Sequence, residues 1–143
     1  MCRMIISLFL ASRQDDRSNY LFKVGLIMTT AITLQQGFTL KNGTYIKNRL
    51  FKSAMSEQLS DAKHNPLPGL ATLYHTWALG GLGLSVTGNL MVDRNALGEP
   101  KQVVLDEQSD LTEFKRWAQQ GSVNDTQLWA QLNHPGKQTP NFI

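Results

Sequence analysis

The sequence has almost none of the residues that build a disulfide framework or a thiolate metal centre. Cys2 is the only cysteine among 143 residues, so no disulfide can form within the chain. The three histidines, His64, His75 and His134, lack the spacing of a zinc site, which needs three or four ligands. We therefore expect no metal site.

Charge is also scarce, and it is unevenly spread. Asp, Glu, Lys and Arg make up 17% of the chain, and the formal net charge of +3 divides into +2 on residues 1–27 and +1 on residues 28–143. No basic stripe interleaved with aromatic residues is present, and no apolar run approaches the roughly 18 residues of a membrane span. A hydrophobic content of 41% is typical of a globular domain. Because the basic stripe and the long apolar run are missing, we expect a protein that binds neither nucleic acid nor membrane. We also expect it to be cytoplasmic.

Residues 1–27 differ from the rest of the chain. The apolar run Met4–Ala11 resembles a weak signal-peptide core, but it is short and charged residues follow at Arg13–Arg17. Met28 begins a segment that looks like a natural start. We predict that residues 1–27 are a disordered extension or the result of a misplaced start, while the signal-peptide alternative stays open.

Turn and strand signals come first in the predicted domain, residues 28–143. The stretch Thr39–Ile46 carries Asn-Gly between β-favouring residues, which predicts a hairpin with a type I′ turn. Three apolar runs that open into polar residues predict further strands over Asn48–Ala54, Leu82–Thr87 and Gln127–Leu132.

A helix is predicted between the first two of these strands. An apolar stripe at helical spacing is formed by Leu70, Leu73, Tyr74, Trp77 and Ala78. The helix is expected to end at Gly80-Gly81, because glycine most easily takes the left-handed conformation that closes a helix.

A second helix is predicted between the last two strands. Asp110 and Glu113 have the spacing of a capping box at its start, and Gly121 is a plausible end. Its buried stripe is expected to contain Leu111, Phe114 and either Trp117 or Ala118. The order of strands and helices, with polar residues after each strand, predicts a parallel α/β fold whose site lies at one end of the sheet.

Individual residues near these strand ends leave alternatives open. Gly81-x-Gly83 precedes a strand, whereas a dinucleotide-binding loop follows one, so a helix end with tight packing is the better interpretation. Gly88 either lets a flat ligand approach the backbone or makes a simple turn. Gln131 offers a donor and an acceptor to a heterocycle, or it is a core glutamine with its hydrogen bonds satisfied. His134 is predicted to be structural.

Four stretches in order and spacing resemble one family, the old yellow enzymes or NADH:flavin oxidoreductases. They are Asn48–Glu57, Leu73–Asn89, Leu97–Pro100 and Gln131–Gln138. The resemblance extends from about Leu34 to Ile143. It implies an eight-stranded (β/α) TIM barrel with FMN at the carboxyl ends of the strands, where such barrels place their sites. It also implies hydride transfer from NADH or NADPH through the flavin to a small-molecule acceptor, often an activated alkene.

The resemblance assigns FMN-binding roles to six residues. Ser53, Ala54 and Met55 would line the flavin, and Ser56 would lie close to its redox-active edge. Gly88 would lie against the isoalloxazine, and Gln131 would hydrogen-bond its pyrimidine edge. Lys137 occupies a position where the family usually has arginine, which alone makes planar bidentate contacts.

Several parts of the family's site have no counterpart in this sequence. These are the substrate-binding His/His or His/Asn pair, the arginine that faces the flavin, the proton-donating tyrosine and the loops that hold the FMN phosphate. A full barrel takes roughly 250 residues, so we expect a partial barrel, namely a hairpin and about three βα units, with no catalytic residue of its own. The expected function is that of an amino-terminal fragment of an FMN-dependent oxidoreductase, inactive alone. The alternatives are a non-enzymatic truncated product that binds FMN weakly or not at all, and an unrelated small α/β binding domain.

Overall fold

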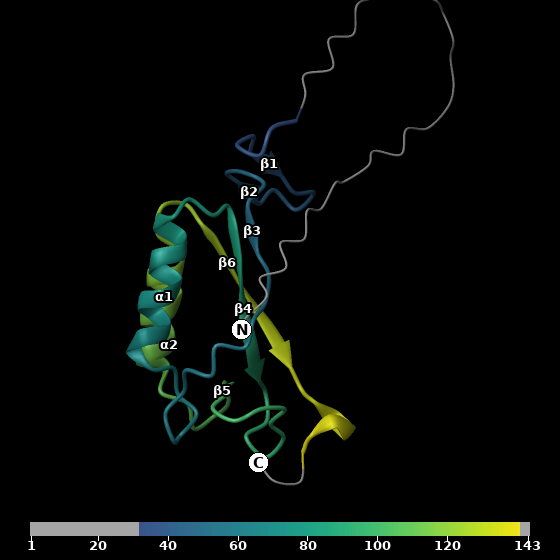
Figure 1. The fold of residues 1–143 in the computed structure, drawn as a ribbon, viewed down its shortest axis with the longest axis vertical. Helices are drawn as coiled ribbons and strands as arrows, with labels where there is room; N and C mark the ends of the chain where they lie inside the picture. Colours follow the sequence, from purple (N-terminus) through teal and green to yellow (C-terminus); the bar gives the residue numbers. More distant parts are fainter. Residues whose placement is uncertain (1–31, 141–143) are drawn as a thin grey trace, which may run out of the picture.

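The computed structural model describes residues 32–140, so the predicted extension over residues 1–27 lies outside the described residues. Two helices, α1 (Pro68–Leu79) and α2 (Leu111–Gly121), lie side by side and cover one face of a parallel sheet (Figure 1). The sheet contains β3 (Phe51–Lys52), β4 (Leu84–Met91), β5 (Val103–Val104) and β6 (Gln127–Asn133). The predicted parallel α/β arrangement is therefore confirmed.

A small hairpin lies at the amino-terminal end of the sheet. Strands β1 (Phe38–Thr39) and β2 (Tyr45–Ile46) pair antiparallel, as predicted. The type I′ turn is wrong, because Gly43 has a φ of +87° while Asn42 keeps a negative φ. Gly43 N donates to Leu40 O at 2.9 Å, which gives an ordinary turn followed by one left-handed glycine. The Asn42 side chain accepts from Thr44 N at 3.1 Å and stabilises this form.

Strand β4 is the centre of the sheet. It pairs with β6 from Leu84 to Met91, and with β3 and β5 near its two ends. It extends beyond the predicted end at Thr87, and β5 was not predicted at all. The register with β6 shifts between Val86 and Asn89, so β4 carries an irregularity there. Such bulges redirect backbone groups away from the ladder, often beside functional sites.

Helix α1 begins and ends as its sequence predicts. Pro68 occupies the first turn, where its missing N–H is not needed. Gly81 closes the helix with a φ of +95°. The predicted stripe packs inward, with Leu70, Tyr74 and Ala78 fully buried. The neighbouring Gly83 packs tightly, since an added Cβ would meet the backbone of Asn48. This supports the helix-end interpretation of the Gly81-x-Gly83 pattern.

Helix α2 confirms its predicted cap only in part. Asp110 Oδ1 accepts from Thr112 N at 2.9 Å, as an N-cap should. The capping box is incomplete, because Asp110 N donates to Asn65 Oδ1 rather than to Glu113. Gly121 is the last helical residue rather than a left-handed stop, since the C-cap is the following serine with a φ of −103°. Of the predicted stripe, Trp117 is buried, while Leu111 and Ala118 are exposed.

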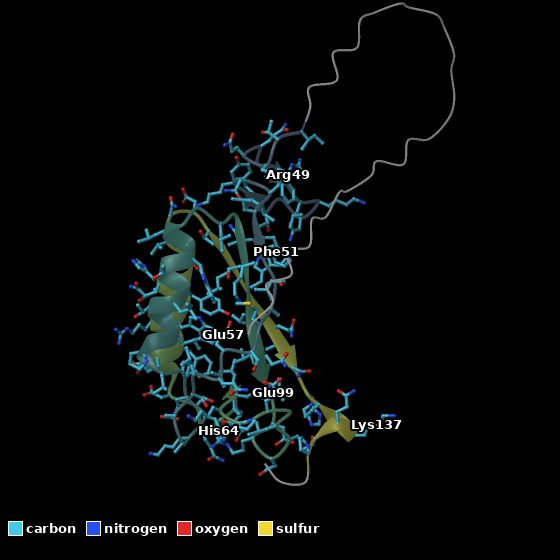
Figure 2. The ribbon with its side chains drawn as sticks, viewed as in Figure 1. Arg49, Phe51, Glu57, His64, Glu99 and Lys137 are labelled. Carbon is cyan, nitrogen blue, oxygen red and sulfur yellow. The ribbon has the colours of Figure 1, made fainter. Side chains whose placement is uncertain are left out.

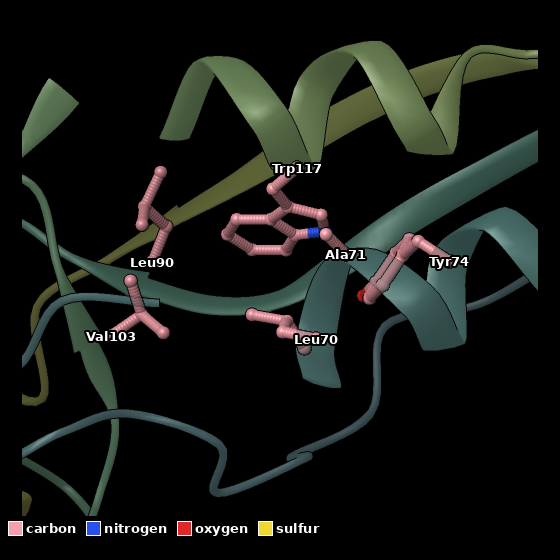
Figure 3. Packing of buried hydrophobic residues seen from close by; sticks show 6 residues of the cluster. All are labelled: Leu70, Ala71, Tyr74, Leu90, Val103 and Trp117. Carbon is pink, nitrogen blue, oxygen red and sulfur yellow. The ribbon is translucent and has the colours of Figure 1, made fainter. Parts of the chain in front are cut away.

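The core lies between the helices and the sheet. Leu70 and Tyr74 of α1, Trp117 of α2 and the strand residues Leu90 and Val103 form one buried cluster (Figure 3). The rings of Tyr74 and Trp117 meet edge to face, 5.3 Å apart. In the described residues the opposite face of the sheet has no helix over it (Figure 1).

Candidate functional site

The carboxyl end of β3 lies against the first half of β4, around a charged pair that is largely removed from solvent. Lys52 Nζ lies 3.2 Å from Glu57 Oε1, and each side chain is only 9% exposed. The ammonium also donates to Val86 O at 2.8 Å and to the Tyr74 hydroxyl at 3.0 Å. Figure 2 shows Glu57 between the sheet and the helices rather than at the surface. All three donor positions of the lysine therefore have partners.

Tyr74 connects this pair to β4. Its hydroxyl donates to Glu57 Oε1 at 2.7 Å and accepts from Gly88 N at 3.1 Å. The bond to Gly88 forms at the irregularity of β4, where this N–H is free of the ladder. Tyr74 is thus both a core residue and the link between helix, loop and strand.

Burial changes the proton affinity of two members of this network. It lowers the pKa of Lys52, and the attraction of Glu57 opposes this without cancelling it. Burial, and then the negative charge of Glu57, raise the pKa of Tyr74 far above its usual range. The phenol therefore stays protonated and serves as a hydrogen-bond donor to the carboxylate.

The loop between Lys52 and Glu57 contains four of the six predicted flavin contacts. Ser53, Ala54 and Met55 are half-buried, and Ser56 is exposed. The Ser56 hydroxyl donates to Glu99 Oε2 at 2.5 Å. Gln58 Nε2 donates to the same oxygen at 3.2 Å, and these two bonds lower the pKa of Glu99. In this arrangement the hydroxyl proton of Ser56 is committed to a carboxylate.

Gly88, the fifth predicted contact, is buried beneath this loop. A Cβ at position 88 would collide with Met55 O and with the Glu57 carboxylate. The missing side chain therefore makes room for the loop itself. Gly88 also shares the lining of one narrow space of about 10 Å³ with Ser56 and Asn89. A space of this size holds about one water molecule.

Gln131, the sixth predicted contact, lies on the exposed part of β6. Its backbone N–H donates to Thr87 Oγ1 at 2.9 Å, and its Nε2 donates to Asn89 Oδ1 at 2.5 Å. Because the side chain is exposed, the alternative of a core glutamine is wrong for the described structure. Its Oε1 and second Nε2 hydrogen remain available to a ligand. Asn89 thus joins Gln131 to the neighbourhood of Gly88.

A polar pocket of about 220 Å³ opens beyond the ends of β4 and β6. Its lining includes Asn89, Glu99, Gln102 and His134. Gln102 accepts from Gly98 N at 2.9 Å, but its buried Nε2 has no hydrogen-bond partner within residues 32–140. His134 Nδ1 accepts from Gly136 N at 3.0 Å, which agrees with a structural role. Within residues 32–140 no group of histidine, cysteine and carboxylate side chains is arranged to hold a metal ion.

Two further sequence predictions concern Lys137 and the absence of a membrane span. Lys137 lies exposed on the short helix η1 (Gly136–Gln138), which follows β6 (Figure 2). Neither helix of the described part of the chain is long and apolar enough to cross a membrane.

Sequence reasoning missed several residues that hold the site together. The stretches that resemble the family contain Lys52, Glu57, Asn89 and Glu99, and the apolar stripe of the first helix contains Tyr74, but the sequence assigns none of them a role in the site. One signal was available, because Lys52 interrupts an apolar strand and a charged residue there needs a partner nearby. Glu57, five residues later, is the first acidic residue after it.

Solved structures share this fold. The old yellow enzyme from Trypanosoma cruzi matches with a TM-score of 0.67 at 18% identity, covering 74% of this chain and 28% of that one. A 2-naphthoyl-CoA reductase in complex with 2-naphthoyl-CoA matches with a TM-score of 0.69 at 23% identity, covering 75% of this chain and 16% of that one. The described residues are therefore a part of a (β/α)8 barrel, as the resemblance to the family implies.

Sequence comparison gives the family. The NADH-dependent flavin oxidoreductase iliE of Hypocrea jecorina (strain QM6a) is 37% identical over 106 residues, which are 71% of this chain and 26% of that protein. No family model matches the chain. Together with the shared fold, this likeness shows that the chain belongs to the old yellow enzyme family of NADH:flavin oxidoreductases. The chain spans about a quarter of the length of this relative.

Proposed function

We propose that residues 28–143 form part of an FMN-dependent oxidoreductase domain, and that they contribute one wall of its flavin site. The wall consists of the loop Ser53–Ser56 and of Gln131, with Gly88 supporting the loop from below. The observation that carries this proposal is the connection between them, since Met55 packs on Gly88 and Asn89 binds Gln131. The donor in the proposed reaction is NADH or NADPH, and the acceptor is a small molecule of the activated-alkene class.

The exposed groups fit the edge of a flavin ring. The free acceptor and donor of Gln131 match a pyrimidine edge, which presents both carbonyl oxygens and an N–H. Ser53, Ala54 and Met55 offer a partly exposed surface on a loop that is fixed at both ends. A bound flavin would supply the hydride chemistry, and the residues of this chain orient it and control the hydrogen bonds around it.

The Glu99 carboxylate places a negative charge near the proposed position of the flavin ring. Glu99 stays ionised because Ser56 and Gln58 both donate to it. A carboxylate there disfavours any further negative charge nearby. We propose that Ser56 acts in concert with Glu99, and not as an isolated hydroxyl.

One observation favours a second function, a product that binds FMN weakly and has no catalytic activity. The polar pocket beyond the ends of β4 and β6 measures about 220 Å³, below the roughly 300–1,000 Å³ of ordinary ligand sites. We propose that this chain alone does not turn over NADH, because it forms one wall of a site and not an enclosure.

A flavin titration tests the proposed site. FMN is added to the purified 143-residue chain, and quenching of flavin fluorescence is followed. Saturable binding is expected, and Gln131→Ala should weaken it about tenfold, the effect of one lost hydrogen-bonding group of about 1.4 kcal/mol. NADH consumption with added FMN should not exceed that of free FMN.

The matched control is Gln127→Ala. Gln127 lies on the same strand but at its amino end, where its Nε2 donates to Tyr45 O at 3.3 Å. This variant should bind FMN as the unchanged chain does. Equal weakening by both substitutions would mean that β6 is merely perturbed, and absence of saturable binding would show that the proposed wall does not form a site.

A further inference from the structure

The loop that carries four of the proposed flavin contacts begins and ends at residues that contact each other. Lys52 and Glu57 form the ion pair at 3.2 Å, and Ser53–Ser56 lie between them in the chain. The pair therefore closes the loop at its base. We refer to Lys52, Glu57 and Tyr74 together as the loop clasp.

The loop clasp is anchored to β4 on one side and to α1 on the other. Lys52 Nζ donates to Val86 O, and Tyr74 accepts from Gly88 N. These two backbone groups belong to the stretch where β4 leaves its regular register with β6. An ordinary strand would use them in the ladder, whereas here they bind the side chains that hold the loop.

The space beneath the loop is matched to the clasp. Gly88 has no side chain where Met55 O and the Glu57 carboxylate approach. The close approach of Met55 O and the Glu57 carboxylate to Gly88 shows that the loop packs directly on β4. Loop, strand and clasp therefore fit together in one arrangement.

We propose that the loop clasp is the positioning device of the flavin site, and that Lys52 fixes the backbone of Ser53–Ser56 through Glu57 and Tyr74. This inference rests on the proposed flavin site. Lys52 is not itself a flavin ligand, because its ammonium lies over the rings of Tyr74 and Trp77, at 4.7 Å and 4.6 Å, on the helix side of the sheet. It is a positioning residue.

Removal of both charges distinguishes an ion pair that only stabilises the fold from one that positions the loop. Loss of one partner leaves a buried, unpaired charge, whereas neutral replacement of both partners is often harmless to stability. The double variant Lys52→Met/Glu57→Gln has neither charge, and Tyr74 can still donate to an oxygen at position 57. The double variant therefore shows whether the loop loses its fixed position when the stability of the fold is retained.

Two readouts on the 143-residue chain test the proposal. Hydrogen exchange is measured by mass spectrometry on peptides that cover residues 53–59 and residues 111–121, and FMN affinity is measured by fluorescence quenching. In the double variant, helix α2 should exchange as in the unchanged chain, while the loop exchanges faster. FMN affinity should fall about tenfold or more, as expected when a binding loop is no longer preorganised.

The matched control is Arg94→Met/Asp106→Asn, which removes another ion pair from loops at the same end of the sheet. Neither the exchange of residues 53–59 nor the FMN affinity should change in this variant. A change of equal size would mean that any loss of an ion pair at this end has the same effect, which would overturn the proposal.

The remaining outcomes also decide the question. If the clasp double variant keeps both the loop exchange and the FMN affinity of the unchanged chain, the clasp serves stability alone and the proposal is wrong. Faster loop exchange with unchanged affinity overturns the positioning role. If the unchanged chain binds no FMN, the proposed function fails by its own test. The loop clasp is then judged by hydrogen exchange alone. Equal exchange of residues 53–59 in the unchanged chain and in the clasp double variant would overturn it, and faster exchange in the double variant would support it.

Discussion

Two ion pairs hold loops at the carboxyl end of the sheet, and they differ chiefly in burial. Lys52 and Glu57 are each 9% exposed, whereas Arg94 and Asp106 are 23% and 19% exposed. The half-buried pair, Arg94 and Asp106, has the better geometry, with two parallel hydrogen bonds of 2.6 Å and 2.7 Å. The buried pair has a longer contact, but it also binds a tyrosine hydroxyl and a backbone carbonyl.

The pKa values show what this difference means. Hydrogen bonds from Arg94 lower the pKa of Asp106 to about 2, so the folded chain favours this charge. Burial lowers the pKa of Lys52 although Glu57 lies beside it, so the folded chain disfavours that charge. An ion pair near the surface is a modest gain, while a buried pair is costly when complete and far more costly when broken.

The largest expected effect comes from breaking the buried pair. Lys52→Met should lower the free energy of unfolding by roughly 3–5 kcal/mol, because Glu57 keeps its charge in a site with little solvent and has lost its cationic partner. Arg94→Met should change stability much less, because water can solvate Asp106. Urea denaturation followed by far-ultraviolet circular dichroism measures both. Equal losses in the two variants would contradict the importance of burial.

A smaller effect is expected from crowding the same pair without removing a charge. Gly88→Ala places a Cβ against Met55 O and the Glu57 carboxylate, so the loop must move outward, at roughly 1–3 kcal/mol of unfolding free energy. Gly98→Ala is the control, because its nearest atoms are 3.7 Å away and its φ is not left-handed. Urea denaturation should show little change for Gly98→Ala. An unaltered stability of Gly88→Ala would mean that the loop is not held where the structure places it.

The smallest effect concerns the half-buried pair, Arg94 and Asp106, and it depends on pH. The folded pKa of Asp106, about 2, lies below its ordinary value of 3.8. Its contribution to stability is therefore fully present above about pH 4 and is lost as the pH falls through about 2. The stability difference between the unchanged chain and Asp106→Asn should be constant at neutral pH and vanish towards pH 2. A difference that persists undiminished at pH 2 would show that the aspartate acts without its charge.

Much of the fold was predictable because local chemistry determines it. Gly81 closes α1 and Asp110 caps α2 through interactions within a few residues. The strands of the sheet follow from apolar runs, and the resemblance to known oxidoreductases ordered them into a barrel. Strand β5 was not predictable in this way, because Val103 and Val104 form a strand only by pairing with Leu90 and Met91 of β4.

The site residues predicted from the sequence differ in where the structure places them. Ser53–Ser56 follow β3 as expected, whereas Gly88 lies within β4, because that strand extends beyond its predicted length, and Gln131 lies within β6. The partners of Ser56 and Gln131 were not predicted, because Glu99 and Asn89 lie more than forty positions away from them in the chain. The role of Gly88 in admitting the loop follows from contacts that only the folded chain reveals.

The close fit of Gly88 beneath Met55 has a consequence for protein engineering. A mutant library that randomises residues 53–56 should retain a uniform backbone as long as Gly88, Lys52 and Glu57 are held constant, since these three set the path of the main chain. The side chains at positions 53–56 can then be varied while the backbone of the loop keeps its conformation. Position 88, in contrast, offers no useful diversity, because a Cβ there would meet Met55 O and the Glu57 carboxylate.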